Sequence, residues 1–315
     1  MAMFLLKRQG APLKRDIIFM ANADEETGGK WGAKWVVDNH FDKIEAEFAL
    51  NEGGFGMSMN GKTLFLCANA EKGMTWVKLT AKGRPGHGSL PHDDNATLHM
   101  SRAINNISKY RPKITVTDTF RSFVKGFSRL DARGRLLSLL DKPGIGPLVL
   151  KLVKDDLVRV MVQTTITPTT IKGGVKVNVI PDHCELGLDC RIVPGVTRED
   201  LERIILDLAD SDKIHLDFEM FNAASESTRD TELFSIIEKV IETNHPDCAL
   251  SAFMLPGGTD SRLLREKGIP AYGFMPGILT REDTASIHGD NEKLSIENLS
   301  HGLRTMFHIV AATCL

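Results

Sequence analysis

The sequence contains little cysteine, no excess of basic charge and no long hydrophobic run. Its 315 residues include five cysteines, an odd number without CxxC spacing, so neither a disulfide framework nor a thiolate zinc site is supported. A formal net charge of −2 provides no basic field that would attract nucleic acid or an anionic membrane. No apolar segment approaches the roughly 20 residues that a membrane-spanning helix needs. We therefore expect a globular cytoplasmic protein with reduced cysteines, and neither a nucleic acid nor a membrane as its partner.

The dinucleotide fingerprint GxGxxG is also absent, which argues against a dehydrogenase. Residues 56–63 do match the phosphate-loop pattern GxxxxGK[ST], but that loop requires a strand before it and a helix after it. Here the residues that follow, 63–68, are strand formers, and Asn60-Gly61 is typical of a tight hairpin turn. We interpret the match as accidental and predict no nucleotide site.

What the sequence does contain is a group of acids after a short apolar run. Ile17–Phe19 has strand propensity, and Asp24, Glu25 and Glu26 follow it, just before a glycine pair. A buried strand that ends in this way would present carboxylates at the edge of a sheet where ligands bind. Two adjacent glutamates can also divide the work at a metal centre between ligation and proton transfer. The alternative is a strand end with a solvated acidic turn.

The pattern of predicted elements changes twice along the chain. Residues 1–74 and 225–315 alternate strands with helices, and a second strand, Glu45–Leu50, again stops at an acid, Glu52, before a glycine pair. Residues 75–224 instead follow the order β-α-β-β-α-β, which is typical of a ferredoxin-like module. We predict an α/β domain made of 1–74 and 225–315, with 75–224 as an inserted α+β domain.

Six stretches, in order along nearly the whole chain, resemble the M20 family of dinuclear zinc peptidases and amidohydrolases, which includes aminoacylases and Gly-X carboxypeptidase-like enzymes. They are ADEETGG, ALNEGG, KGRPGHGSLP, KVNVIPDHCELGLDCRIVPG, GGTDSRLLREKGIPAYGF and IHGDNEKLSIENL. The resemblance implies a catalytic α/β domain with an inserted lid that also mediates dimerisation. It further implies hydrolysis of amide bonds in small peptides or N-acyl amino acids by a zinc-activated water.

The resemblance assigns roles to the acids and to one histidine. Glu25 would be the general base, Glu26 and His288 would ligate one zinc ion, and Glu52 would ligate the other. Carboxylates and neutral imidazole suit Zn²⁺, and paired metals can polarise a carbonyl while generating hydroxide. Without the resemblance, His288 would be interpreted as a surface histidine and Glu52 as a solvated turn acid.

Further roles implied by the resemblance fall on the inserted domain and on a glycine-rich loop. His87 would reach the active site of a partner subunit and stabilise the developing oxyanion. Asn178 and Arg191 would hold the carbonyl and the carboxylate of the substrate, Arg191 because its fork binds carboxylates bidentately. The alternatives are a turn residue for Asn178 and an ordinary ion pair for Arg191. Gly258 and Thr259 would contact the substrate.

Three other histidines match no functional position of the family, and we interpret them as structural or exposed: His92, His183 and His301.

One departure from the family pattern concerns the first residues. Family members carry a His-x-Asp motif and a bridging Asp, whereas no histidine precedes Ile17 here and the only earlier acid is Asp16. MAMFLLKRQG resembles the end of the helix that follows those motifs, so we expect a chain without the family's first segment. Intact members bind two zinc ions per site, and we expect weak or incomplete binding here. Two hypotheses result: an impaired zinc hydrolase that forms a homodimer through its lid, and a non-catalytic dimerising remnant.

Overall fold

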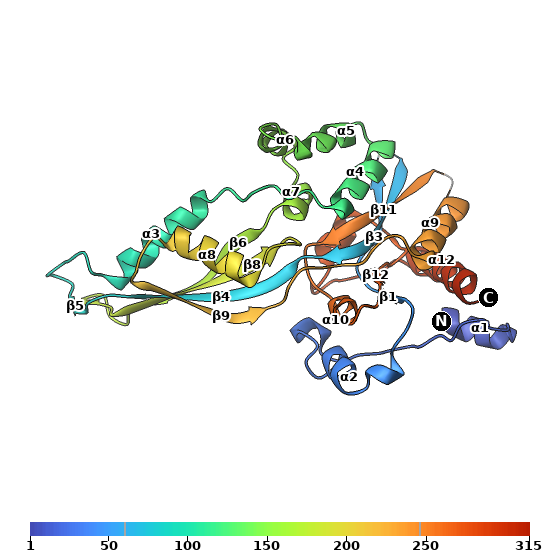
Figure 1. The fold of residues 1–315 in the computed structure, drawn as a ribbon, viewed down its shortest axis with the longest axis horizontal. Coiled ribbons are helices and arrows are strands. Elements are labelled where there is room, and N and C mark those ends of the chain that lie inside the picture. Colours follow the sequence, from blue (N-terminus) through green and yellow to red (C-terminus); the bar gives the residue numbers. More distant parts are fainter. Residues whose placement is uncertain (60, 246) are drawn as a thin grey trace. The chain divides into compact units, whose positions relative to one another are not determined.

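The computed structural model describes residues 1–59, 61–245 and 247–315, and it divides into two compact units (Figure 1). The first unit contains Met1–Glu71, Val116–Lys154 and Ser225–Leu315. The second contains Lys72–Thr115 and Asp155–Ala224. This division differs from the predicted boundaries at two places: Val116–Lys154 groups with the first unit and not with the inserted one, and residues 72–74 group with the inserted one.

The helices of the segment Val116–Lys154 explain its position. α4 (Asp118–Leu130) begins at the N-cap Thr117 and buries Phe120, Phe123 and Val124 against the sheet of the first unit. A Cβ atom added at Gly126 would lie 2.7 Å from Cβ of Ser251, so this helix approaches its neighbouring strand closely. The rest of the segment consists of short helices: α5 (Arg133–Leu137), η3 (Ser138–Asp141) and α6 (Gly146–Val153).

The sheet of the first unit is built around β3 (Lys62–Glu71), whose residues are almost all buried. β3 pairs in parallel with β11 (Cys248–Leu255) and antiparallel with three shorter strands. The shorter strands are β2 (Gly56–Met59), β10 (Ser225–Glu226) and β12 (Ala271–Gly273). Two edge strands complete this sheet: β1 (Ala49–Asn51), parallel to β12, and β13 (Ile278–Leu279), parallel to β2.

Helices cover this sheet with their apolar faces. α9 (Glu232–Asn244) and α12 (Ile296–Cys314) lie side by side, and Ile237, Ile241 and Ile309 pack on Phe65 and Tyr272. A smaller core joins α2 (Ala33–Asn39) and α10 (Ser261–Glu266) to β12. The remaining helices of the unit are α1 (Ala2–Gln9), η1 (Glu25–Thr27), η2 (Phe41–Lys43) and α11 (Arg281–Ser286).

The prediction of a strand at Ile17–Phe19 is wrong. These residues have no regular secondary structure, and Ile18 and Phe19 are 48% and 77% exposed. Strand propensity stabilises a strand only where a neighbouring strand accepts its hydrogen bonds and buries one of its faces, and no pairing is formed here among the described residues. Glu25 and Glu26 therefore do not follow a buried strand, whereas Glu52 does follow β1, as predicted.

The second unit confirms the predicted β-α-β-β-α-β order. Its sheet runs β6 (Thr165–Gly173), β8 (His183–Ile192), β4 (Gly73–Lys82), β9 (Ile214–Phe221), with every neighbouring pair antiparallel. α3 (Ala96–Lys109) and α8 (Arg198–Ala209) lie side by side on one face and form the core with it (Figure 1). The unit also contains β5 (Gly86–His87), α7 (Asp156–Val162) and β7 (Val179–Ile180). The predicted fold class, mixed α/β with an inserted α+β domain, is therefore correct.

The segment that matched the phosphate-loop pattern forms two strands. β2 and β3 pair antiparallel, with Ser58 opposite Thr63, so residues 62–71 form a strand and not the helix that a phosphate loop requires. Asn60, the first residue of the predicted turn, lies outside the described residues. In the described part of the chain, no helix has the length and hydrophobicity needed to cross a membrane.

Candidate active site

Glu25 and Glu26 lie on the tight turn η1. The residue before it, Asp24, has a left-handed backbone (φ 53°). A Cβ atom at Gly32 would lie 1.9 Å from the carbonyl oxygen of Ala23, so the chain passes too close to itself here for a larger residue. A turn of this kind fixes the backbone of both glutamates without help from a strand.

The structure brings Glu26 and His288 together, although 261 residues lie between them in the sequence. Glu26 Oε1 lies 3.7 Å from His288 Nδ1, and both side chains are largely exposed. His288 follows α11 and has a left-handed backbone (φ 61°). Glu52 interacts electrostatically with both side chains. The residues predicted to ligate metal therefore share one region of the first unit.

Glu25 has the most perturbed carboxyl group of this region. Burial, and after it the nearby carboxylates of Glu52, Asp260, Glu26 and Glu71, together raise its pKa to about 7. At neutral pH such a group exists in both protonation states. A carboxylate with this pKa can accept a proton and return it, which is what general base catalysis requires.

The carboxyl groups around Glu25 are perturbed in the same sense. The pKa of Glu52 is raised by partial desolvation and by Glu26 and Asp260, although part of its side chain reaches solvent and His288 acts in the opposite direction. Burial also raises the pKa of Asp260, which accepts a hydrogen bond from Asn22 Nδ2 at 3.1 Å. The region therefore holds a concentration of negative charge that a cation would stabilise.

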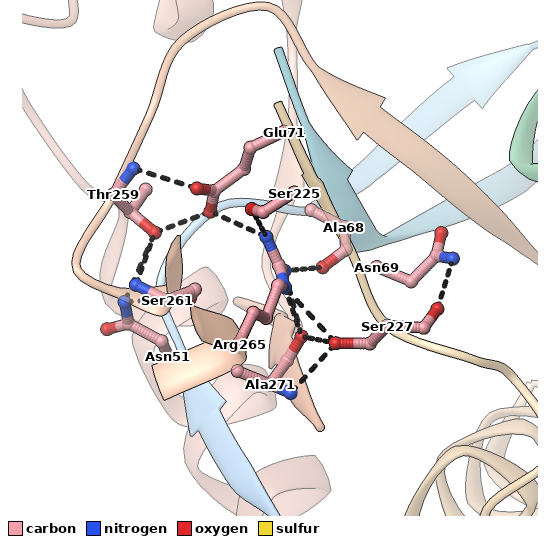
Figure 2. Close-up of polar contacts among 10 residues, drawn as sticks. All are labelled: Asn51, Ala68, Asn69, Glu71, Ser225, Ser227, Thr259, Ser261, Arg265 and Ala271. Atoms are coloured by element: carbon pink, nitrogen blue, oxygen red, sulfur yellow. Dashed lines mark hydrogen bonds and ion pairs between the residues drawn. The ribbon is translucent and has the colours of Figure 1, made fainter. Parts of the chain in front are cut away.

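Thr259, predicted to bind substrate, is buried and bonded within the protein. Its backbone N–H and its hydroxyl both donate to the carboxylate of Glu71, at 3.2 and 2.6 Å (Figure 2). The neighbouring Gly258 has open space where a side chain would be. In this arrangement Thr259 shapes the loop, and only Gly258 offers a free surface.

In the second unit, the pairing of β5 with β7 places His87 and Asn178 close together. His87 pairs with Val179, and the carbonyl oxygen of Asn178 accepts a hydrogen bond from the N–H of Gly88 at 2.8 Å. Nδ1 of His87 accepts the backbone N–H of Ser89 at 3.3 Å and lies 2.7 Å from its hydroxyl. Because a backbone N–H can only donate, the proton of the neutral ring lies on Nε2, which leaves Nε2–H as a hydrogen-bond donor.

Arg191 is already engaged with a carboxylate. Its Nε and Nη2 donate to the two carboxylate oxygens of Asp189, at 2.6 and 2.9 Å. Near it lies Lys72, a buried residue whose pKa is lowered to about 7 by burial and by Arg191. A substrate carboxylate would therefore have to share this guanidinium with Asp189.

Sequence reasoning missed Asp260, Glu71 and Arg265. Asp260 and Arg265 lie within a stretch that resembles the family, but nothing in that stretch distinguished them from their neighbours. Glu71 had a visible signal, a charged Glu-Lys pair between two apolar strands, β3 and β4. A charge in that position must be buried, and a buried charge needs a partner.

The donors present only partly fit a metal ion. A carboxylate and an imidazole are ligands that zinc accepts, and Glu26 and His288 are close enough to approach one ion. Catalytic zinc sites use about three protein ligands, however. Across residues 1–59, 61–245 and 247–315, no group of three or more His, Cys, Asp or Glu side chains could hold an ion. Within the described residues the donor set is therefore incomplete.

Comparison with known proteins confirms the resemblance to the M20 family. Residues 69–216 match the peptidase dimerisation domain of that family. Probable carboxypeptidase S-like 2 of Dictyostelium discoideum is 28% identical, over 98% of this chain and 61% of its own length. Aminoacylase-1B of Rattus norvegicus is 28% identical, over 98% of this chain and 66% of its own length. The chain thus spans less than two thirds of the length of these relatives.

Solved structures share the fold at low sequence identity. A tripeptidase from Staphylococcus aureus has a TM-score of 0.63 at 16% identity, covering 99% of this chain and 67% of that one. A dinuclear metal-binding peptidase of the M20 family from Bacillus subtilis has a TM-score of 0.61 at 14% identity, covering 99% of this chain and 69% of that one. The fold of the chain is thus that of M20 metallopeptidases.

Proposed function

We propose that this chain, a relative of the M20 peptidases and aminoacylases, carries the general base of a hydrolase that cleaves amide bonds in small peptides or N-acyl amino acids. The observation that supports the proposal most strongly is the position of Glu25. Its pKa is about 7, and Glu26 and Glu52 are among the carboxylates that raise it. The names of the relatives, aminoacylase and carboxypeptidase, indicate the class of substrate.

In the proposed reaction the Glu25 carboxylate removes a proton from water as the water oxygen bonds to the amide carbon. The carbon–nitrogen bond then breaks, and the proton passes from Glu25 to the departing nitrogen. The products are a carboxylic acid and an amine, and Glu25 returns to its ionised form. A pKa of about 7 suits both transfers, because neither protonation state of Glu25 is strongly favoured at neutral pH.

The metal is a separate part of the proposal. Glu26 and His288 would bind a divalent cation, and zinc is the ion that their chemistry suits. Glu52 interacts electrostatically with both side chains, but binding would be weak, because two protein ligands leave most of the coordination shell to water. When bound, zinc would polarise the scissile carbonyl and acidify water.

The second unit would serve dimerisation and substrate binding. The match of residues 69–216 to a dimerisation domain supports a homodimer. We propose that His87 donates through Nε2–H to the oxyanion in the partner's site and that Asn178 and Arg191 hold the substrate. The free Nε2–H of His87 suits that role because an oxyanion needs a donor. The absence of disulfides among the five cysteines is compatible with the proposed cytoplasmic location.

The alternative function is a non-catalytic dimerising protein. The incomplete donor set of the described residues favours it. Both proposed functions include a homodimer. Only the hydrolase would turn over a substrate.

The experiment that separates the two is a hydrolysis assay with N-acetyl amino acids and dipeptides, with and without added zinc. We expect slow turnover by the chain and a loss of about 100-fold in Glu25→Gln. Glu45→Gln is the matched control, since Glu45 is an exposed glutamate that does not contribute to the perturbed pKa of Glu25. If no condition gave turnover, the dimerising function would be preferred. If both variants turned over substrate at the rate of the natural chain, Glu25 would not be the general base.

A further inference from the structure

A fully buried ion pair lies beside the candidate site and takes no part in the proposed reaction. Arg265 Nη1 lies 3.3 Å from Glu71 Oε1, and the two side chains are 3% and 2% exposed. Arg265 comes from α10 and Glu71 from the end of β3. Burying two charges is unfavourable unless hydrogen bonds satisfy their remaining groups, so further hydrogen-bond partners are expected around this pair.

The guanidinium of Arg265 is satisfied on every nitrogen (Figure 2). Nε donates to Ser227 Oγ and to the carbonyl oxygen of Ala271, both at 3.1 Å. Nη1 donates to Ser225 Oγ at 3.1 Å, and Nη2 donates to the carbonyl oxygens of Ala68 and Ala271 at 3.2 and 2.8 Å. The planar group is therefore held in one orientation by β3, β10 and β12, and a lysine could not reproduce these contacts.

Glu71 uses its remaining hydrogen-bonding capacity on Thr259. The Thr259 hydroxyl donates to Oε1 and its backbone N–H donates to Oε2, at 2.6 and 3.2 Å. The same hydroxyl oxygen accepts the backbone N–H of Ser261 at 3.2 Å and Asn51 Nδ2 at 3.3 Å. Asn51 Nδ2 also donates to Ser261 Oγ at 3.1 Å. The hydroxyl of Thr259 thus joins the ion pair to two separate segments of the chain.

These two segments carry groups of the candidate site. Asp260 lies between Thr259 and Ser261, and Glu52 directly follows Asn51. The loop before Thr259 contains Gly257 and Gly258, for which a Cβ atom would meet nothing within 4 Å, so the loop has few packing contacts of its own there. The hydrogen bonds around Thr259 therefore fix the end of this loop.

We propose that Glu71 and Arg265 are positioning residues that act through the Thr259 hydroxyl, holding Asp260 and Glu52 at their places beside Glu25. The inference rests on the proposed function in treating Glu25 as the working group of the site. Neither residue of the pair touches the reacting atoms in this account.

The test is amide hydrogen exchange measured by mass spectrometry on peptides that cover 49–54 and 256–262, in the intact chain. Thr259→Val keeps the shape of the side chain but removes the hydroxyl, and we expect exchange about tenfold faster in both segments. Thr259→Ser keeps the hydroxyl and should exchange like the natural chain. Thr75→Val is the control, because the Thr75 hydroxyl is buried without a hydrogen-bond partner among the described residues.

The exchange experiment does not depend on turnover, so it decides the positioning role even if the proposed hydrolysis fails. Unchanged exchange in Thr259→Val, or faster exchange in the 256–262 peptide alone, would overturn the proposal. If hydrolysis is detected, kcat should fall in Thr259→Val by about tenfold with a smaller change in KM, and Thr259→Ser should restore it. A loss confined to KM would also count against a role in positioning the catalytic acids.

Discussion

Two contacts of the first unit, a buried ion pair and an exposed pair formed by a glutamate and a histidine, differ in their surroundings. The side chains of Glu71 and Arg265 are 2% and 3% exposed, whereas those of Glu26 and His288 are 74% and 71% exposed. The buried pair is surrounded by hydrogen-bond partners from β3, β10, β12 and the segments after β10 and before α10, and it cannot move without breaking these bonds. The exposed pair has freedom to rearrange around a ligand. The comparison shows how one unit can combine a rigid support with an adaptable site.

The largest effect is expected from breaking the buried pair. Glu71→Ala leaves the Arg265 guanidinium buried without its counter-charge, and we expect the free energy of unfolding to fall by about 3–5 kcal/mol. Urea denaturation measures this, with Glu45→Ala, an exposed glutamate, as the control. A loss below about 1 kcal/mol would mean that water or other groups compensate Arg265.

A smaller effect is expected from pH. The pKa of Glu25 is raised from 4.5 to about 7 on folding. Between these two pH values the folded state therefore keeps a proton that the unfolded state has lost. Stability from this group is therefore present below pH 4.5 and is lost as the pH rises through about 7. Between pH 4.5 and 8 the natural chain should lose about 1–2 kcal/mol more than Glu25→Gln, less than the full conversion of the pKa shift because solvent screens this partly exposed side chain. The free energy of unfolding is measured by urea denaturation at several pH values. If it changed with pH in the same way for both proteins, the raised pKa would be contradicted.

Zinc affinity should depend on the exposed pair. His288→Ala removes one of the two closest donors, and we expect zinc binding to weaken by about tenfold or more, since even the loss of an outer partner of a metal ligand has an effect of that size. Calorimetric titration of both proteins measures it, and His183→Ala, in the second unit, is a matched control. If the two variants bound zinc equally well, Glu26 and His288 would not be ligands.

The smallest effect is expected on stability when the exposed pair is broken without metal. Glu26→Ala should change the free energy of unfolding by less than about 0.5 kcal/mol, because exposed ion pairs contribute little. The same urea experiment compares this loss in the free energy of unfolding with the much larger loss expected for Glu71→Ala. A loss of 2 kcal/mol or more would show that the pair supports the fold.

The sequence was sufficient to predict elements whose signals are local. The β-α-β-β-α-β order of residues 75–224 was predicted in this way and is found in the second unit, where α8 begins at Thr197 with a complete capping box. The closeness of Glu26 and His288 also agrees with the expectation from the resemblance.

What could not be predicted depends on distant partners. The apolar run Ile17–Phe19 has the composition of a strand, but composition does not supply a neighbouring strand. Thr259 was expected to face the substrate, yet it is bonded to Glu71, which lies 188 positions away and carries no local sign of that contact. Buried polar networks of this kind become visible only when the fold brings their members together.

The central claim is that folding holds the Glu25 carboxyl group ready for proton transfer at neutral pH. The most direct measurement is its titration by ¹³C NMR in the intact chain, with the signal assigned by its disappearance in Glu25→Gln. The account predicts a midpoint of about 7. A midpoint near 4.5, the ordinary value for glutamate, would contradict it and would remove Glu25 from the proposed reaction.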